Sequence, residues 1–271
     1  MIRHRIFVLG HRGMLGHTVA RYLAERGHEL VTSSRRYSGR AKDELLQEVN
    51  ASDCNWVINA IGLIPQKSRD DDQLLRINAV LPLHLLQELG ESQRVIHPST
   101  DCVFSGRKGN YQPGEHKDSE DTYGLSKALG EQIQRDPRVL VMRTSIIGPD
   151  LGSSAGLLGW FLKQEGEVNG YTNHFWNGIT TLEWAKAAEE VIRGAAPVSQ
   201  GVVQLGTRDR HSKNEMLHLF AEVWNRTVTI HPLATAETID RTLHPEWTRG
   251  GLYDQLLELK TWMDHPPPAA E

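Results

Sequence analysis

The sequence predicts an α/β protein built on a doubly wound, mostly parallel sheet. Three observations support this fold class. Residues 6–9 form an apolar run that leads directly into a glycine-rich turn, and a helical apolar pattern follows that turn at once. Strand-like runs then alternate with helical patterns as far as residue 144. This alternation is typical of parallel strands joined by covering helices, whose buried strands read as continuous apolar runs.

The composition narrows the class of protein. The chain has 271 residues, of which 39% are hydrophobic and 24% charged. That length suits one α/β domain with a smaller appended region. The formal net charge of −4 provides no general basic surface, so we expect no nucleic-acid partner. No apolar run approaches the roughly 20 residues that span a bilayer, so we expect no membrane partner.

The two cysteines, Cys54 and Cys102, are too few for a disulfide framework. Both lie in apolar, strand-like contexts, which predicts buried free thiols. The apolar run at residues 6–9 is too short for a signal peptide. These features are typical of the cytoplasm, where we expect the protein to act. No group of His, Cys and Asp residues has the spacing of metal ligands, so no metal site is predicted.

The first turn carries the spacing G-x-x-G-x-x-G between a strand and a helix. One glycine allows the sharp turn, one lets the backbone approach a pyrophosphate, and one lets the helix pack closely on the strand. The N–H groups at the start of the helix attract phosphate. Three glycines alone also suit a tight loop in any α/β protein, but their place after the first strand favours a dinucleotide. The predicted cofactor-binding residues of this turn are Gly10, His11, Arg12, Gly13, Met14, Leu15 and Gly16.

The second strand, residues 29–32, ends in Ser33-Ser34-Arg35-Arg36. An acidic residue at this point would hold the ribose 2′-hydroxyl of NAD. Arg35 and Arg36 instead suit the 2′-phosphate of NADP, and Arg12 could reach the same phosphate. The alternative is that both are solvated loop charges. We therefore expect NADP(H) as the cofactor, with NAD(H) as the second choice.

Two further segments add polar groups to the predicted sheet. A buried strand at residues 56–62 follows a short helix at 43–49 and ends in small residues that leave room for a ligand. The next helix, residues 70–89, contains Pro82, which removes one hydrogen bond and favours a kink. Asn78 in this helix is either a satisfied core amide or a polar support of the active site.

The centre of the chain combines a strand that ends in hydroxyl groups with a tyrosine and a lysine. The strand, residues 95–100, ends in Ser99 and Thr100, and a helix over 123–134 opens with Tyr123-x-x-x-Lys127. Residues four apart share one helix face. Tyrosine titrates at about pH 10, and a nearby lysine charge lowers that pKa, so we expect the phenol to be a usable proton donor. A strand-end hydroxyl could bind the same substrate oxygen while a nicotinamide delivers hydride. The alternative is an ordinary exposed i,i+4 pair.

The pattern changes after residue 149. Residues 170–178 are dense in aromatic and amide side chains, which either stack on a base or sugar or pack within a hairpin. Thr180 reads as a helix N-cap. Further helices are predicted at 157–163, 180–193, 213–224 and 253–262, with a strand at 139–144 and another at 201–206. We expect a cofactor-binding domain over 1–150 and a mainly substrate-binding region over 151–271, with residues about 179–206 returning to the first domain.

Residues 10–16, 99–101 and 143–145, with Tyr123 and Lys127, resemble an extended short-chain dehydrogenase/reductase. They are most similar to the dTDP-4-dehydrorhamnose reductase group of nucleotide-sugar 4-ketoreductases, over roughly residues 5–225. Gly-His-Arg-Gly-Met in the turn also resembles GDP-fucose synthase, where the arginine meets the NADP phosphate. Cys102 replaces an aromatic residue of the family pattern, and residues 170–178 lack its Pro-Thr segment.

The resemblance implies a Rossmann sheet, NADPH-dependent reduction of the 4-keto group of a nucleotide-activated deoxysugar, and a role in cell-surface polysaccharide synthesis. It implies that Thr100, Tyr123 and Lys127 are catalytic, with Tyr123 as proton donor and Lys127 also on the nicotinamide ribose. It further implies that Asn59, Ala60, Ile61 and Ser99 belong to the cofactor site. The implied substrate-binding residues are Asp101, Cys102, Tyr171, Asn173 and Trp176. Relatives often dimerise, so a homodimer is a further expectation. The alternatives are an epimerase with tightly bound NAD and a non-catalytic regulatory subunit.

Overall fold

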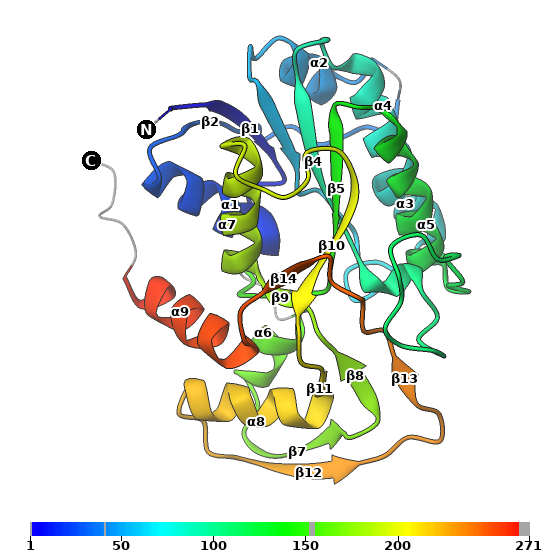
Figure 1. Ribbon diagram of the computed structural model, residues 1–271, viewed down its shortest axis with the longest axis vertical. Helices are drawn as coiled ribbons and strands as arrows, with labels where there is room; N and C mark the ends of the chain where they lie inside the picture. Colours follow the sequence, from blue (N-terminus) through cyan, green and yellow to red (C-terminus); the bar gives the residue numbers. More distant parts are fainter. Residues whose placement is uncertain (1, 41, 152–154, 266–271) are drawn as a thin grey trace.

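A seven-stranded parallel sheet forms the centre of the larger part of the molecule (Figure 1). The computed structural model describes residues 2–40, 42–151 and 155–265. The strand order is β14-β10-β5-β4-β3-β1-β2. The strands are β1 (Arg5–Leu9), β2 (Glu29–Val31), β3 (Trp56–Asn59), β4 (Arg94–Ser99), β5 (Val139–Arg143), β10 (Gly201–Thr207) and β14 (Trp247–Arg249). The predicted α/β class with a doubly wound parallel sheet is confirmed.

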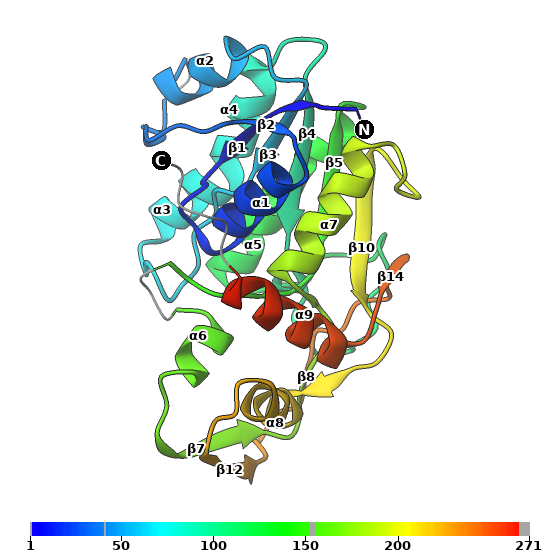
Figure 2. The same cartoon turned by 90° about the vertical axis from the view of Figure 1, so that its left-hand side faces the viewer.

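Helices cover both faces of this sheet. In Figure 2, α1 (Met14–Glu25) and α7 (Thr181–Ile192) lie on the face turned to the viewer. The other face carries α2 (Glu44–Asn50), α4 (Leu81–Glu88) and α5 (Thr122–Gly130). Alternate residues of β1 enter the two cores, because Ile6 and Val8 pack toward α1 and α7 while Phe7 and Leu9 pack toward α2 and α4. A strand buried on both sides has no polar alternation, which explains its continuous apolar run.

The long helix expected over residues 70–89 is divided into three segments. α3 (Asp71–Leu75) runs into a π-helical turn, η1 (Arg76–Val80), and α4 follows with Pro82 in its first turn. Pro82 has no N–H to bond the carbonyl of Asn78 four residues earlier. That carbonyl faces α5, since a Cβ added at Gly130 would lie 2.1 Å from the Asn78 oxygen. The proline therefore coincides with a close contact between η1 and α5.

A smaller part of the molecule lies below the carboxyl ends of the sheet strands (Figure 1). Its elements are α6 (Leu157–Phe161), β7 (Gly166–Tyr171), β8 (His174–Trp176), β11 (His211–Ser212), α8 (Lys213–Val223), β12 (Val228–Leu233) and β13 (Ile239–Asp240). β7 pairs in parallel with β12, and β8 lies between β11 and β13. The hairpin considered for residues 170–178 is wrong, because β7 and β8 take other partners. Strands β12 and β13 were not anticipated.

The second half of the chain also contributes to the large sheet. β10 and β14 are two of its strands, and α7 covers it. The short strands β6 (Ile146–Ile147) and β9 (Ile179–Thr180) pair with each other beside the sheet. Two single turns, η2 (Asp101–Val103) and η3 (Glu131–Arg135), follow β4 and α5. The boundary expected at residue 150 stays a prediction.

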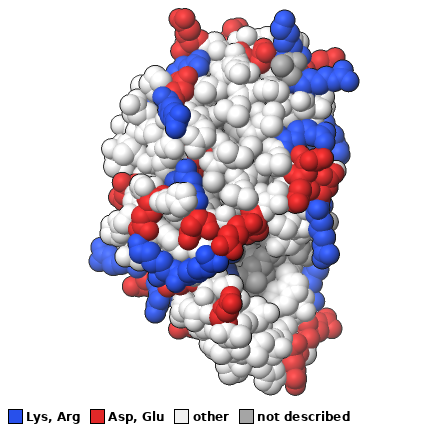
Figure 3. Space-filling view, turned by 90° about the vertical axis from the view of Figure 1, so that its right-hand side faces the viewer, with Lys and Arg blue, Asp and Glu red and all other residues white. Residues whose placement is uncertain are grey.

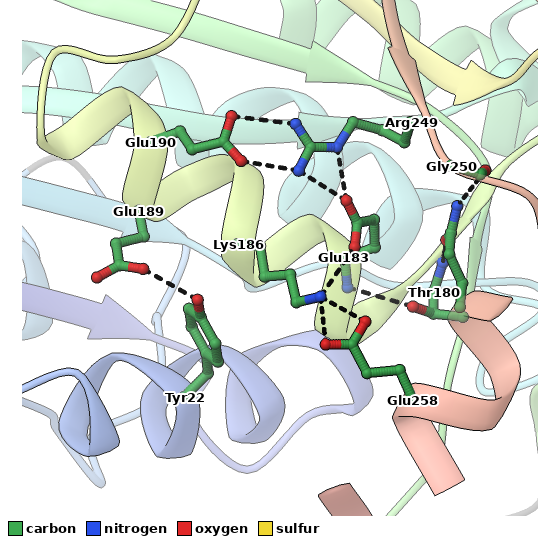
Figure 4. Close-up of polar contacts among 10 residues, drawn as sticks. Tyr22, Thr180, Glu183, Lys186, Glu189, Glu190, Arg249, Gly250 and Glu258 are labelled. Carbon is green, nitrogen blue, oxygen red and sulfur yellow. Dashed lines mark hydrogen bonds and ion pairs between the residues drawn. The ribbon is translucent and has the colours of Figure 1, made fainter. Parts of the chain in front are cut away.

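The last helix, α9 (Leu252–Asp264), packs its leucines into the core of the smaller part. Charged side chains also join this C-terminal segment to α7 (Figure 4). Arg249 of β14 binds Glu183 and Glu190, and Lys186 pairs with Glu258 of α9. In the described part of the chain, no helix has the length and apolar character to cross a membrane.

Candidate active site

A cleft of about 920 Å³ opens between the carboxyl edge of the large sheet and the smaller part of the molecule. The chain goes from β1 to β2 on one side and then crosses over to β3 on the other side of β1, and α/β sheets bind ligands at such a reversal of strand order. Figure 3 shows a hollow between the larger and smaller parts, bordered by charged side chains of both signs. The predicted site residues that line the cleft are Gly13, Met14, Leu15, Ala60, Ile61, Ser99, Thr100, Asp101, Cys102, Tyr123, Lys127 and Trp176.

Other residues predicted for the cofactor lie behind the cleft lining. Gly10 has φ +74°, and a Cβ there would lie 2.9 Å from the backbone of Ala60. A Cβ at Gly16 would lie 2.1 Å from the Gly10 carbonyl oxygen, so this glycine serves helix packing. Asn59 is fully buried, and its amide binds the ring of His97. His11 and Arg12 are likewise outside the cleft lining.

The two aromatic-segment residues predicted for the substrate, Tyr171 and Asn173, do not line the cleft. The Asn173 amide donates to the carbonyl oxygens of Thr235 and Glu237, at 2.9 and 3.1 Å. The Tyr171 ring packs against His174, with 4.6 Å between ring centroids. Both residues therefore organise the smaller part of the molecule, and Trp176 is the member of the segment that reaches the cleft.

Thr100 is positioned by the end of β4. Its hydroxyl caps the η2 turn by accepting a hydrogen bond from the Cys102 N–H at 3.1 Å, and it donates to the Asp101 carboxylate at 3.0 Å. Tyr123 lies in the first turn of α5, whose N-terminus is capped by Asp121. Thr100 and Tyr123 both line the cleft. The strand end and the helix start thus place the two hydroxyl-bearing residues on the same cavity.

Lys127 is one turn further along α5. Its ammonium donates to the Pro98 carbonyl oxygen at 2.8 Å, and burial lowers the pKa of Lys127 to about 8. Burial also raises the pKa of Tyr123, and neighbouring acidic groups add to that rise. The expectation of a lowered Tyr123 pKa is therefore wrong in this structure, because desolvation of the phenolate outweighs any stabilisation by a nearby positive charge. Tyr123 holds its proton at neutral pH, as a proton donor must.

Ser99 lines the cleft, but its hydroxyl donates to the buried carboxylate of Glu131 at 2.6 Å. The Glu131 carboxylate also binds Arg143 of β5. The sequence interpretation did not include Glu131, although its place four residues after Lys127 put it on the same helix face.

Four further cations of the cleft lining were also missed: Lys67, Arg69, Lys213 and Arg241. Lys213 begins α8, and its ammonium lies 5.8 Å from the centre of the Trp176 ring. Arg241 follows β13 and donates to the Phe104 carbonyl oxygen at 3.1 Å. Burial lowers the pKa of Lys213, while Asp101 acts in the opposite direction. Neither Lys213 nor Arg241 belongs to a local sequence motif, because only the fold brings these two side chains to the cleft.

The two cysteines are free thiols, as predicted. Cys54 is also buried, which confirms that expectation, although it lies in the loop before β3 and Cys102 lies in η2, so neither is in a strand. Cys102 is only partly buried and lines the cleft, where it donates weakly to the Asp101 carboxylate at 3.6 Å. Burial raises its pKa to about 12.

Arg35 and Arg36 line a second cavity of about 370 Å³, beyond the tip of β2. Ile61 borders both cavities. Arg76 of η1 is a third arginine in this lining. Arg35 pairs with Glu44 and Glu48 of α2. The sequence interpretation did not anticipate these acidic residues. They lie about ten residues after the arginines, and only the packing of α2 brings them back to Arg35.

A parallel sheet with a glycine turn after its first strand, and a Tyr–Lys pair beside a strand-end threonine, define the short-chain dehydrogenase/reductase class. Within this class, residues 4–245 match the family model described as the RmlD substrate binding domain. The chain belongs to this family, which confirms the resemblance stated from the sequence.

Individual relatives agree with this assignment. A probable low-salt glycan biosynthesis reductase, Agl14 of Haloferax volcanii, is 28% identical over 171 residues, 57% of each chain. The chain spans about half the length of the curated relatives it matches. The dTDP-4-dehydrorhamnose reductase of Bacillus anthracis, solved with NADP, has a TM-score of 0.82 at 16% identity and covers 97% of this chain and 100% of its own. WbmG of Bordetella bronchiseptica, solved with NAD and UDP, has a TM-score of 0.78 at 16% identity, covering 97% and 96%.

Proposed function

We propose that this protein reduces the 4-keto group of a nucleotide-activated deoxysugar with NADPH, as a step in the synthesis of a cell-surface polysaccharide. The observation that carries the proposal is the arrangement of Tyr123, Thr100 and Lys127 at one side of the large cleft. The family match supports the substrate class, and the names of the relatives above support a sugar-nucleotide reductase.

The glycine turn fits a dinucleotide. Gly13 is the N-cap of α1 and supplies no side chain to bond the first N–H groups of the helix. Gly13, Met14 and Leu15 line the cleft at this helix start, so those N–H groups and the helix dipole are available to phosphate oxygens. A bound NADPH would supply the hydride. The basic second cavity would take the 2′-phosphate, with Arg36 as its main cation.

The chain itself supplies the proton and its placement. Tyr123 Oη donates its proton to the substrate oxygen as the carbonyl becomes an alcohol, and it recovers a proton from solvent afterwards. Thr100 Oγ1 holds the same oxygen and fixes its distance to the phenol. Lys127 stabilises the transient phenolate with its charge and would bind the ribose next to the nicotinamide. Burial of the pair excludes water and strengthens both interactions.

The far side of the cleft suits the nucleotide half of the substrate. Lys213 and Arg241 present two positive groups that would bind a diphosphate. Trp176 offers an aromatic face for the sugar or the base. Asp101 and Cys102 lie between these groups and the catalytic hydroxyls, where they would contact the sugar ring.

A substrate panel tests this function. The protein is incubated with NADPH or NADH and with dTDP-, UDP- or GDP-linked 4-keto-6-deoxysugars, and loss of the reduced nicotinamide absorbance is followed. We expect NADPH to be consumed with at least one of them. Tyr123→Phe should lose about 10²–10⁴-fold in turnover, the usual contribution of a general acid. Tyr171→Phe is the matched control, because Tyr171 lies outside the cleft, and it should keep full turnover.

Two results would contradict the proposal. Sugar isomerisation without net cofactor consumption, together with NAD that stays bound through purification, would indicate an epimerase. No turnover on any keto-sugar, together with stable copurification with an enzyme, would indicate a regulatory subunit.

A further inference from the structure

We propose that Glu131 is a positioning residue of the active site, whose single carboxylate holds the strand end that carries Thr100 and supplies a buried negative charge to the helix face that carries Lys127. The expected effect of Glu131 on turnover rests on the proposed function. Its effect on the position and charge of neighbouring side chains does not depend on any substrate. Glu131 opens η3 directly after α5, and its side chain is 0% exposed.

The carboxylate uses both oxygens. Oε1 accepts from the Ser99 hydroxyl at 2.6 Å and from Arg143 Nε at 2.8 Å. Oε2 accepts from Arg143 Nη2 at 2.8 Å and pairs with Lys117 Nζ at 2.6 Å. Ser99 is the last residue of β4 and directly precedes Thr100, so the Glu131 carboxylate holds the strand end, the neighbouring strand β5 and the loop before α5.

The same cluster reaches the sheet edge and the loop over it. Arg143 is 1% exposed and donates its other N–H groups to the Gln204 side chain at 2.9 Å and the Pro113 carbonyl oxygen at 3.1 Å. A buried arginine needs a carboxylate of this kind, because an unpaired charge in the interior is costly. Glu131 therefore determines where Arg143, and with it the wall behind the catalytic groups, can lie.

Glu131 also acts on Lys127 by charge. The two residues are four positions apart on one helix face, and both are buried. Burial lowers the Lys127 pKa to about 8, and the negative charge of Glu131 opposes that fall. Glu131 stays ionised, since Arg143 and Lys117 hold its own pKa at about 2 despite burial. His97 of β4 adds no charge near Lys127, because burial keeps the pKa of His97 well below its ordinary value and its ring neutral.

Among the groups around Lys127, Glu131 is the one whose charge opposes the effect of burial on the Lys127 pKa. The titratable and charged residues on its own helix and on the elements packed against it are Asp71, Asp72, Arg76, His84, Glu88, Arg94, His97, Asp101, Cys102, Lys117, Tyr123, Glu131, Arg135 and Arg143. Tyr123 and His97 are neutral at pH 7 by the pKa directions given above. Lys117 is the partly exposed member of the cluster, with 17% of its side chain exposed, so it can be changed with little disturbance of the core.

Three variants of the full chain separate charge from packing. Glu131→Gln removes the negative charge, Glu131→Asp keeps it, and Lys117→Gln removes a positive charge that offsets it. The readout is the pH midpoint of the Lys127 side-chain ¹³Cε signal in lysine-labelled protein, assigned with Lys127→Arg. We expect a midpoint lower by about one pH unit in Glu131→Gln, higher in Lys117→Gln, and close to the unmodified protein in Glu131→Asp. The limb of the kcat/KM pH profile assigned to Lys127 should move in the same directions.

A merely structural role predicts loss of activity in all three variants with no opposed shifts of the Lys127 midpoint. The proposal is overturned if Glu131→Gln leaves the midpoint in place, or if Glu131→Gln and Lys117→Gln move it the same way. Should Glu131→Gln fail to fold, Lys117→Gln decides by the presence or absence of the upward shift. The NMR titration needs no substrate, so an absence of keto-sugar turnover would refute the proposed function while the role of Glu131 is still tested.

Discussion

Lys127 places an ammonium group in a site that burial makes unfavourable for charge. Its pKa is about 8 in the folded protein, against about 10.5 in an unfolded chain. The nearby carbonyl of Pro98 satisfies one N–H group, but it does not replace bulk solvation. Lys127, which the proposed reaction needs, therefore weakens the fold near neutral pH, as active-site residues commonly do.

The unfavourable burial of the charged Lys127 side chain predicts that the stability of the protein depends on pH. Between about pH 8 and 10.5 the unfolded chain binds a proton at this lysine that the folded protein has released, so the free energy of unfolding rises with pH. Lys127→Met removes the titrating group. Urea unfolding at a series of pH values should show the unmodified protein gaining, relative to Lys127→Met, up to about 3 kcal/mol from pH 7 to pH 10. A constant difference between the two proteins would show that Lys127 titrates normally.

Arg36 should determine the choice between NADPH and NADH. Arg35 is already paired with Glu44 and Glu48, whereas Arg36, in the same cavity, forms no ion pair with any described carboxylate. A hydrogen bond to a charged group contributes about 1.5–3 kcal/mol, so Arg36→Ala should weaken NADPH binding about 10–100-fold and leave NADH binding nearly unchanged. Fluorescence titration with both cofactors measures this. Arg35→Ala is the matched control with a smaller expected loss; equal losses in both variants would refute the assignment.

At the scale of elements, the first half of the chain could be predicted well because its signals are local. Buried strands such as β1 and β5 carry continuous apolar runs, and the glycine turn and the Tyr123–Lys127 spacing each lie within a few residues. β13 has two residues and gains its identity only by pairing with β8, so it leaves no periodic pattern. Lys213 and Arg241 reach the cleft through such pairings, which explains why the sequence interpretation missed them.

The contact between η1 and α5 is an element-scale feature that can be tested at Gly130. A Cβ there would lie 2.1 Å from the Asn78 carbonyl oxygen, which is backbone and cannot move aside cheaply. Gly130→Ala should therefore push α5 from η1, lower the free energy of unfolding by about 1–3 kcal/mol and reduce turnover by displacing Lys127. Gly114→Ala is the control, since a Cβ at Gly114 meets nothing within 4 Å. Thermal unfolding and kcat of both variants are compared; similar values would mean that the contact is not tight.

At the scale of the whole molecule, the C-terminal segment ties the smaller part to the large sheet. β14 is the edge strand beside β10, and α9 packs its leucines into the core beneath the cleft. Arg249 holds this segment to α7 by charge-assisted hydrogen bonds to Glu183 and Glu190 (Figure 4). Its side chain is 11% exposed, so salt screens these pairs only weakly. The stability of the cleft floor therefore depends on Arg249, more than a hundred positions away from α5.

Arg249→Met should leave two carboxylates on α7 without their main cation and lower the free energy of unfolding by about 2–3 kcal/mol, somewhat less than for a fully buried pair because Glu190 is partly exposed. Lys186→Met is the matched control on the same helix. It breaks a close pair with the exposed Glu258 and a longer one, at 3.4 Å, with Glu183, and should cost less than about 1 kcal/mol. Urea unfolding at low and high ionic strength distinguishes the two variants. The loss of unfolding free energy in Arg249→Met should persist in salt, while the loss in Lys186→Met should disappear. If high salt abolished both deficits, the Arg249 pairs would behave as surface ion pairs, and α9 and β14 would be held by apolar packing alone.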